Sequence, residues 1–198
     1  MKTTMSWMLA AALLAAGGAA AGEIDNPFVK ANVGDWARYT LSMNMMGMPS
    51  PGKALMKVVE KSDKEAVLQV DQEMNIFGQV QKNSQKQTID LTASFDPTKL
   101  MAATPEMGDV KITPIKSDKE TIEGGDGQTY ECDVNEVAVA ANEQGSGTVK
   151  IWVSPKAKMA VVKLEMTMSV AMGEQKMEVK MNMALAAQGD ANTPDEDA

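Results

Sequence analysis

Two neighbouring segments near the C-terminus decide the fold: Lys163-Leu-Glu-Met-Thr-Met-Ser-Val-Ala-Met172 and Met177-Glu-Val-Lys-Met-Asn-Met-Ala-Leu185. In both, apolar residues alternate with mostly polar ones. Successive side chains of a β-strand point to opposite faces of a sheet, so this period of two predicts two strands with one apolar face each. Gly-Glu-Gln-Lys at 173–176 separates them, a length typical of a hairpin built on a type I turn. The sequence therefore predicts an antiparallel hairpin.

The two apolar rows also suggest a register for this hairpin. Pairing Met172 with Met177 places Met168 opposite Met181 and keeps every apolar side chain on one face. In this register Met168 and Met181 face each other inside the protein.

Weaker segments of the same kind recur along the chain, and polar or glycine-rich turns separate them. The other predicted strands are Trp36–Met46, Leu55–Lys61, Ala66–Gln72, Gln87–Ala93, Val110–Ile115, Thr121–Glu123, Tyr130–Val139 and Thr148–Val153. Pro49-Ser-Pro-Gly52 is predicted as a turn, and only Pro97–Ala103 as a helix. The fold class is therefore all-β and mainly antiparallel, a curved sheet, half-barrel or barrel of roughly eight to eleven strands with at most one or two short helices.

The ends of the chain differ from its middle. Lys2 precedes an apolar run from Trp7 to Ala16, and small residues follow, which is typical of a secretory signal peptide over residues 1–21. The run is shorter than the roughly 20 apolar residues that a spanning helix needs. Residues 189–198 contain four acidic residues and no basic one, which predicts a disordered acidic tail. We expect an exported protein, periplasmic or extracellular and soluble, with a single β domain over residues 22–188.

Composition excludes several classes of function. The chain has 198 residues and no histidine, which removes Ser/His/Asp and Cys/His catalysis and histidine-ligated zinc. A net charge of −8 argues against binding nucleic acid or an acidic membrane surface. The acidic side chains are scattered, so we expect no enzyme, no cofactor and no carboxylate metal site. Cys132 is the only cysteine, so the chain has no internal disulfide, and we expect a buried, inert thiol.

Methionine is unusually frequent, with 18 residues against three Trp, two Tyr and three Phe. Three interpretations remain open. The thioethers fill the core, line a pliable face that binds an apolar ligand, or bind Cu(I) or Ag(I). A structural or interaction module with no small ligand is a further possibility. For an apolar ligand, the candidate binding residues are Met43, Met45, Met166, Met168, Met181, Met183 and Trp152.

Trp152 is a candidate because of its position in its strand. Alternation places Val149 and Ile151 on one face of the strand over 148–153, and Trp152 on the other, nominally wet face. Either the loop over Pro155–Ala160 covers the indole, or the indole contacts a ligand or partner.

The stretch from Ile151 to Met166 carries Trp-x-Ser followed, after a loop, by Val-Lys-x-Glu, and Asn26-Pro-Phe with Val33-Gly-Asp-Trp36 has the same character. This arrangement resembles uncharacterised exported bacterial β proteins and, more distantly, the LolA-like group of periplasmic lipoprotein and lipid carriers. The resemblance implies an incomplete antiparallel barrel with helices across its mouth, and an apolar concave side that shelters lipid or lipoprotein acyl chains. It implies no catalytic residues. This chain departs from the group in having few aromatic residues and little helix.

Overall fold

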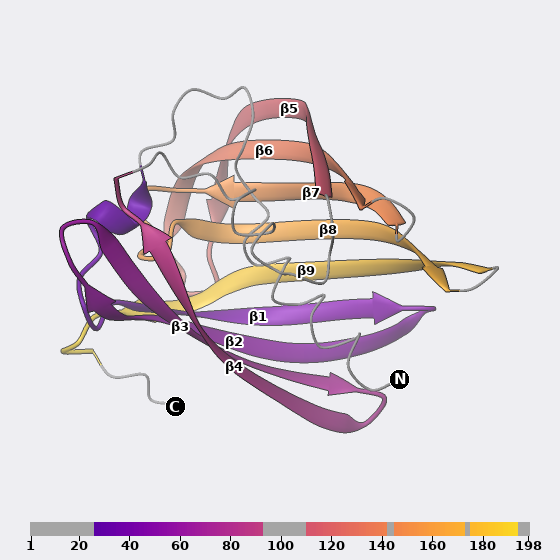
Figure 1. The fold of residues 1–198 in the computed structure, drawn as a ribbon, viewed down its shortest axis with the longest axis horizontal. Helices are drawn as coiled ribbons and strands as arrows, with labels where there is room; N and C mark the ends of the chain where they lie inside the picture. Colours follow the sequence, from indigo (N-terminus) through magenta and orange to yellow (C-terminus); the bar gives the residue numbers. More distant parts are fainter. Residues whose placement is uncertain (1–25, 93–109, 142–144, 173–174, 194–198) are drawn as a thin grey trace.

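The computed structural model describes residues 26–92, 110–141, 145–172 and 175–193. Within them, nine strands form one antiparallel sheet in the order β4-β3-β2-β1-β9-β8-β7-β6-β5 (Figure 1). The strands are β1 (Trp36–Met45), β2 (Met48–Lys61), β3 (Glu65–Ile76), β4 (Gln79–Asp90), β5 (Val110–Glu123), β6 (Thr129–Ala141), β7 (Gly145–Val153), β8 (Val161–Met172) and β9 (Gln175–Gly189), and η1 (Pro27–Val29) is a short 3-10 helix. The sheet is strongly curved, and its edge strands β4 and β5 do not pair with each other. The predicted all-β, curved antiparallel fold is confirmed.

The sheet consists of two meanders joined in its middle. Strands β1 to β4 pair in sequence order on one side, and β5 to β9 do so on the other. The junction is the antiparallel pair of β1 with β9, in which Met43 lies opposite Met181. The first and last strands of the domain therefore form the centre of the sheet, and the residues of the C-terminal hairpin belong to its core.

The predicted register of the β8–β9 hairpin is wrong by two residues. Met172 pairs with Gln175, and Met168 therefore lies opposite Val179, while Met166 lies opposite Met181. A shift of two leaves every side chain on its predicted face, so the alternating pattern could not detect it. The length of the connection decided the register, because only two residues separate Met172 from Gln175.

Three further predicted boundaries are corrected. The segment 49–52 is not a turn but the start of β2, because the β1–β2 turn lies at Met46 and Gly47, between the paired Met45 and Met48. The two strands predicted over 110–123 are one continuous strand, β5, with an irregularity between Pro114 and Lys116. Strand β4 begins at Gln79, eight residues before its predicted start. The predicted helix over 97–103 lies outside the described residues.

One face of the sheet carries most of the core, and we call it the inner face. In β1 it presents Tyr39, Leu41 and Met43, which are all buried, while Thr40 and Ser42 on the outer face are exposed. The inner side chains of the neighbouring strands join the same hydrophobic cluster. The apolar alternation in the sequence therefore marks the core-facing side, as a half-buried antiparallel sheet requires.

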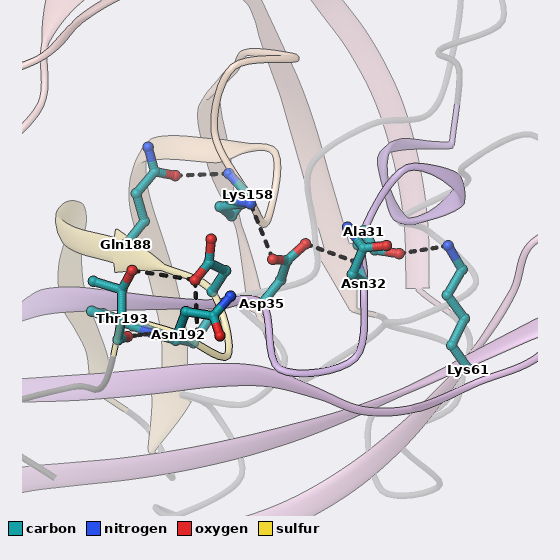
Figure 2. Close-up of polar contacts among 10 residues, drawn as sticks. Ala31, Asn32, Asp35, Lys61, Lys158, Gln188, Asn192 and Thr193 are labelled. Atoms are coloured by element: carbon teal, nitrogen blue, oxygen red, sulfur yellow. Dashed lines mark hydrogen bonds and ion pairs between the residues drawn. The ribbon is translucent and has the colours of Figure 1, made fainter.

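A cluster of hydrogen bonds holds the end of the sheet at which β1 begins and β9 ends, which we call the packed end. The Asp35 carboxylate accepts hydrogen bonds from the Asn32 backbone N–H at 2.8 Å and from Lys158 Nζ at 3.0 Å (Figure 2). The Lys158 backbone N–H donates to Gln188 Oε1 at 2.8 Å. These contacts join the segment before β1, the β7–β8 loop and β9, which are far apart in the sequence.

The C-terminal boundary differs from the predicted one. A turn over 190–193 follows β9, and Asp190 accepts hydrogen bonds from the backbone N–H of Asn192 and the hydroxyl of Thr193. The indole N–H of Trp36 donates to the backbone oxygen of Thr193 at 2.6 Å. The segment expected to be a tail from Gly189 therefore begins as part of the folded domain. Residues 194–198 and the predicted signal peptide over 1–21 lie outside the described residues.

Candidate ligand-binding face

The six candidate methionines lie on the inner face of three adjacent central strands. Met43 of β1 pairs with Met181 of β9, which in turn pairs with Met166 of β8. The adjacent rows are Met45, Val179 and Met168 on one side, and Leu41, Met183 and Leu164 on the other. Residues directly opposite each other in antiparallel strands have Cβ atoms about 5 Å apart, so these side chains form one continuous apolar surface. We call this surface, across β1, β9 and β8, the Met face.

Burial on the Met face decreases along β8. Met43, Met45, Met181 and Met183 are each at most 4% exposed. Met166 and Met168 are only partly buried, and so is Met177 of β9. The centre of the Met face is therefore core, whereas its β8 side and its end near the β8–β9 turn remain partly accessible.

The inner face becomes polar at β4 and at one position of β3. Gln72 of β3 lies opposite Asn83 of β4, and the next inner residues along β4 are Gln85 and Gln87. Gln72 is 6% exposed, and its Nε2 has no hydrogen-bond partner. The Oε1 of Gln87 is also buried without a partner. A buried polar group without a partner costs roughly 1–3 kcal/mol, so these two amides are places where a ligand could supply a hydrogen bond.

A third amide, with an unpartnered nitrogen, lies on the other side of the Met face. Asn135 of β6 shares the row of Ile151, Leu164 and Met183 on the inner face. Its Oδ1 accepts a hydrogen bond from Ser117 at 2.8 Å, whereas its Nδ2 is buried without a partner. Unpartnered amides thus flank the Met face on both sides.

The sequence interpretation missed these amides. It overlooked the first part of β4 because the inner positions there are Gln and Asn, and an apolar alternation was the only strand signal considered. Amides at 79, 81, 83, 85 and 87 nevertheless alternate with other residue types. This period of two was the signal that could have identified the strand.

Trp152 is not part of the Met face. It lies on the outer face, where it pairs with Lys163 and Val134, and it is 3% exposed. Its Nε1 donates a hydrogen bond to Glu120 at 2.8 Å, and Lys150 Nζ lies 4.4 Å from its ring centroid. Lys163 Nζ lies 4.7 Å from the same centroid. The indole is thus enclosed by cation–π contacts and a charge-assisted hydrogen bond, and its candidate role as a ligand contact stays a prediction.

Glu120 provides a pH test of this cluster. The hydrogen bond from Trp152, and then that from Lys150, lower the pKa of Glu120 below its ordinary value of 4.5. The carboxylate's contribution to stability is therefore present above the unfolded-state pKa and is lost as pH falls through the lower folded-state pKa. We expect the indole N–H resonance of Trp152, followed by NMR, to titrate with a midpoint below 4.5, and to lose this titration in Glu120→Gln. A midpoint at or above 4.5 would contradict the described contacts.

Cys132 is a free, buried thiol, as predicted. Burial raises its pKa to about 11, and the charges of Asp133 and Glu120 act in the same direction. We expect a thiol reagent at pH 8 to react with the native protein about two orders of magnitude more slowly than with the urea-unfolded chain, because the thiolate is the reactive species. Similar rates in the two states would show that Cys132 is accessible.

Two features are absent from the described residues. No group of three or more His, Cys, Asp or Glu residues among them is placed to hold a metal ion. Within the same part of the chain, no helix is long and apolar enough to cross a membrane.

No protein-family model and no curated protein sequence matches the chain. Three solved structures illustrate what it is similar to. A Parabacteroides distasonis protein described as a lipoprotein shares 11% identity at a TM-score of 0.42, covering 80% of this chain and 96% of the other. The S-type phycobiliprotein lyase CPES from Guillardia theta shares 9% identity at a TM-score of 0.38, covering 80% and 89%. A Vibrio parahaemolyticus domain described as an outer membrane lipoprotein-sorting protein shares 12% identity at a TM-score of 0.23, covering 83% and 88%.

These identities and TM-scores describe a distant likeness, from which we transfer neither a ligand nor a site residue. The descriptions of two of these structures refer to lipoproteins.

Proposed function

We propose that this chain is an exported, non-catalytic protein that binds the acyl chain of a lipid or lipoprotein on its Met face. The observation that carries the proposal is the position of the six methionines on one face of three adjacent strands in an open, curved sheet. Methionine is unbranched and polarizable, so a surface made of it can repack around apolar guests of different shape. Partial exposure of Met166 and Met168 supports entry on the β8 side.

The flanking amides favour an amphiphile over a pure hydrocarbon. Gln72 and Asn135 offer unpartnered N–H donors, and Gln87 offers an unpartnered oxygen. An ester, amide or hydroxyl group at the head of an acyl chain would satisfy these groups and remove the cost of leaving them unpaired. The ligand proposed is therefore an acyl chain with an uncharged polar group near its end.

Two measurements test this function. Mass spectrometry of an organic extract from gently purified protein is expected to show a bound lipid, and added lipid should displace a fluorescent fatty-acid probe. The double variant Met166→Gln/Met168→Gln should weaken probe binding at least tenfold, because two amides replace apolar contacts at partly buried positions. The matched control Thr167→Gln lies on the outer face of the same strand and should bind normally. A clean extract with no probe binding would overturn the proposal and leave an interaction module without a small ligand.

Copper remains the second candidate, because the row of Met43, Met181 and Met166 brings three thioethers to neighbouring strands. Thioethers select Cu(I). However, Met43 and Met181 are almost fully buried as core, and only Met166 of this row is partly accessible to an ion. We expect no Cu(I) or Ag(I) binding tighter than micromolar, measured under reducing conditions against a competing chelator. A stoichiometric, tighter complex that is lost when these three residues become leucine would replace the lipid proposal.

A further inference from the structure

Two hairpins carry bulky apolar residues at turn positions that favour small or polar ones. The β1–β2 turn is Met46-Gly47, and the β3–β4 turn is Phe77-Gly78. Their φ values are 55° and 81° in the first turn, and 52° and 79° in the second. Two successive residues with positive φ are characteristic of a type I′ turn, in which Asn, Asp or Gly usually holds the first position. Met46 and Phe77 therefore adopt a backbone conformation that is unfavourable for their residue types.

These two side chains contribute little packing to the described part of the protein. Met46 is 75% exposed and Phe77 is 60% exposed, and beside them Met48 is 45% and Val80 is 56% exposed. We call these four residues the apolar tips. An Asn-Gly sequence would form the same turns with less strain and without exposing apolar surface. The fold of the described residues therefore gives no reason for Met46 and Phe77 at these positions.

Both tips project from the same end of the sheet. Strands β1, β2 and β3 are antiparallel neighbours, so the β1–β2 and β3–β4 turns lie at the same end of the sheet, beyond the last β2–β3 pair, Gly52 with Met74. Figure 1 shows both turns on the right of the view, away from the packed end, with the β3–β4 turn below the β1–β2 turn. Met168 and Met177, the partly buried residues of the Met face, also lie toward this end, since β8 and β9 approach their connection there.

The chemistry of the tips fits a lipid bilayer. Residues 45–49 are Met-Met-Gly-Met-Pro and residues 76–80 are Ile-Phe-Gly-Gln-Val, so neither turn brings a charge that would need desolvation. Single side chains on two narrow turns can each enter the interfacial region of a bilayer separately. The net charge of −8 opposes an anionic surface and favours a zwitterionic one.

We propose that the apolar tips insert into the interface of a zwitterionic bilayer and present the adjacent end of the Met face to the membrane. The bilayer is then the surface with which the protein exchanges its acyl-chain ligand, and this exchange step rests on the proposed function. Membrane attachment itself depends only on the tips.

Flotation of the protein with phosphatidylcholine vesicles tests the attachment. The wild type is expected to float with the vesicles, and Met46→Asn/Phe77→Asn should bind at least tenfold more weakly. Because Asn-Gly suits a type I′ turn, this variant should melt at the same temperature or higher, so its loss of binding cannot come from unfolding. The control Val33→Asn removes another exposed apolar side chain, which precedes β1 near the packed end, and should bind vesicles like the wild type.

Three results would overturn the inference: no flotation of the wild type, equal flotation of the double variant, or binding that appears only with anionic vesicles and disappears in salt. Fatty-acid probe binding in solution separates this inference from the proposed function. The tip variant should bind the probe normally. Probe binding without flotation would overturn only the attachment of the apolar tips to a membrane. Flotation without probe binding would overturn only the proposed lipid-binding function.

Discussion

Replacing Met181 with lysine is expected to lower the free energy of unfolding by about 4 kcal/mol, because it places an ammonium without a partner in the core. Met181 is 1% exposed in the middle strand of the sheet, between Met43 and Met166. The thioethers of its two paired neighbours are only weak hydrogen-bond acceptors and carry no charge to balance the ammonium. Native domains are stable by only about 5–15 kcal/mol, so this loss would leave a marginal protein. Urea denaturation followed by circular dichroism measures it.

Two variants of the same strand serve as controls for Met181→Lys. Asn182→Lys on the exposed outer face lies opposite Glu165 and should change stability by less than about 0.5 kcal/mol. Met181→Leu keeps the apolar volume and should cost less than about 1.5 kcal/mol. Equal midpoints for Met181→Lys and Asn182→Lys would show that the inner face is wrongly assigned. Met168→Lys should cost less than Met181→Lys, because Met168 is only partly buried.

The sequence contained enough information to predict the strands and their faces, but not the pairing. Apolar residues at every second position indicate which face of a strand is buried. The same faces result in pairing registers that differ by two residues, so the pattern does not distinguish between them. Met168 was therefore placed on the correct face and opposite the wrong partner. Register depends on the turn, and the turn between β8 and β9 lacks a sequence signature that fixes its length.

Proline misled the prediction for β2. Pro49 and Pro51 suggested a turn, yet both lie in a strand that pairs with β1. Pairing of β2 with β3 begins only at Gly52, so the prolines occupy a stretch with one free edge. A residue without an N–H is tolerated at such an edge. A single sequence does not show which part of a strand is an edge.

The candidate site was predictable only in its apolar part. Alternation identified the inner methionines, because apolar residues at every second position indicate the face of a strand that packs against the core. Gln72 and Gln87 were missed because they are polar residues on the inner face, against the usual pattern. The apolar tips were missed because Met-Gly and Phe-Gly do not carry the Asn-Gly or Asp-Gly signature of a tight hairpin. In each case, the missed residue is of a type that its local structure disfavours: a polar residue on the inner face, or a bulky apolar residue in a tight turn. Such departures are expected where function opposes stability.

Replacing Asp35 with alanine is expected to lower the free energy of unfolding by about 3 kcal/mol, because it breaks a buried ion pair from one side. Asp35 is 2% exposed, and its carboxylate binds the Asn32 N–H and the Lys158 ammonium at the packed end (Figure 2). Alanine would leave both donors without this acceptor. The side chain of Lys158 is 37% exposed, so water can replace part of its lost contact, and the expected cost lies at the low end for a broken buried pair.

A double-mutant cycle in urea separates the ion pair from the rest of the Asp35 environment. Lys158→Ala alone should cost less than Asp35→Ala, since the carboxylate then keeps its bond from Asn32. The double variant should lose less than the sum of the two single losses, by about 1 kcal/mol, because the same contact is removed in both. Asp63→Ala, at an exposed position in the β2–β3 turn, is the matched control and should leave the midpoint unchanged. If Asp35→Ala behaved like Asp63→Ala, the carboxylate would not be what joins the segment before β1 to the β7–β8 loop, and the packed end would be held by its other contacts, such as the bond from the Lys158 N–H to Gln188.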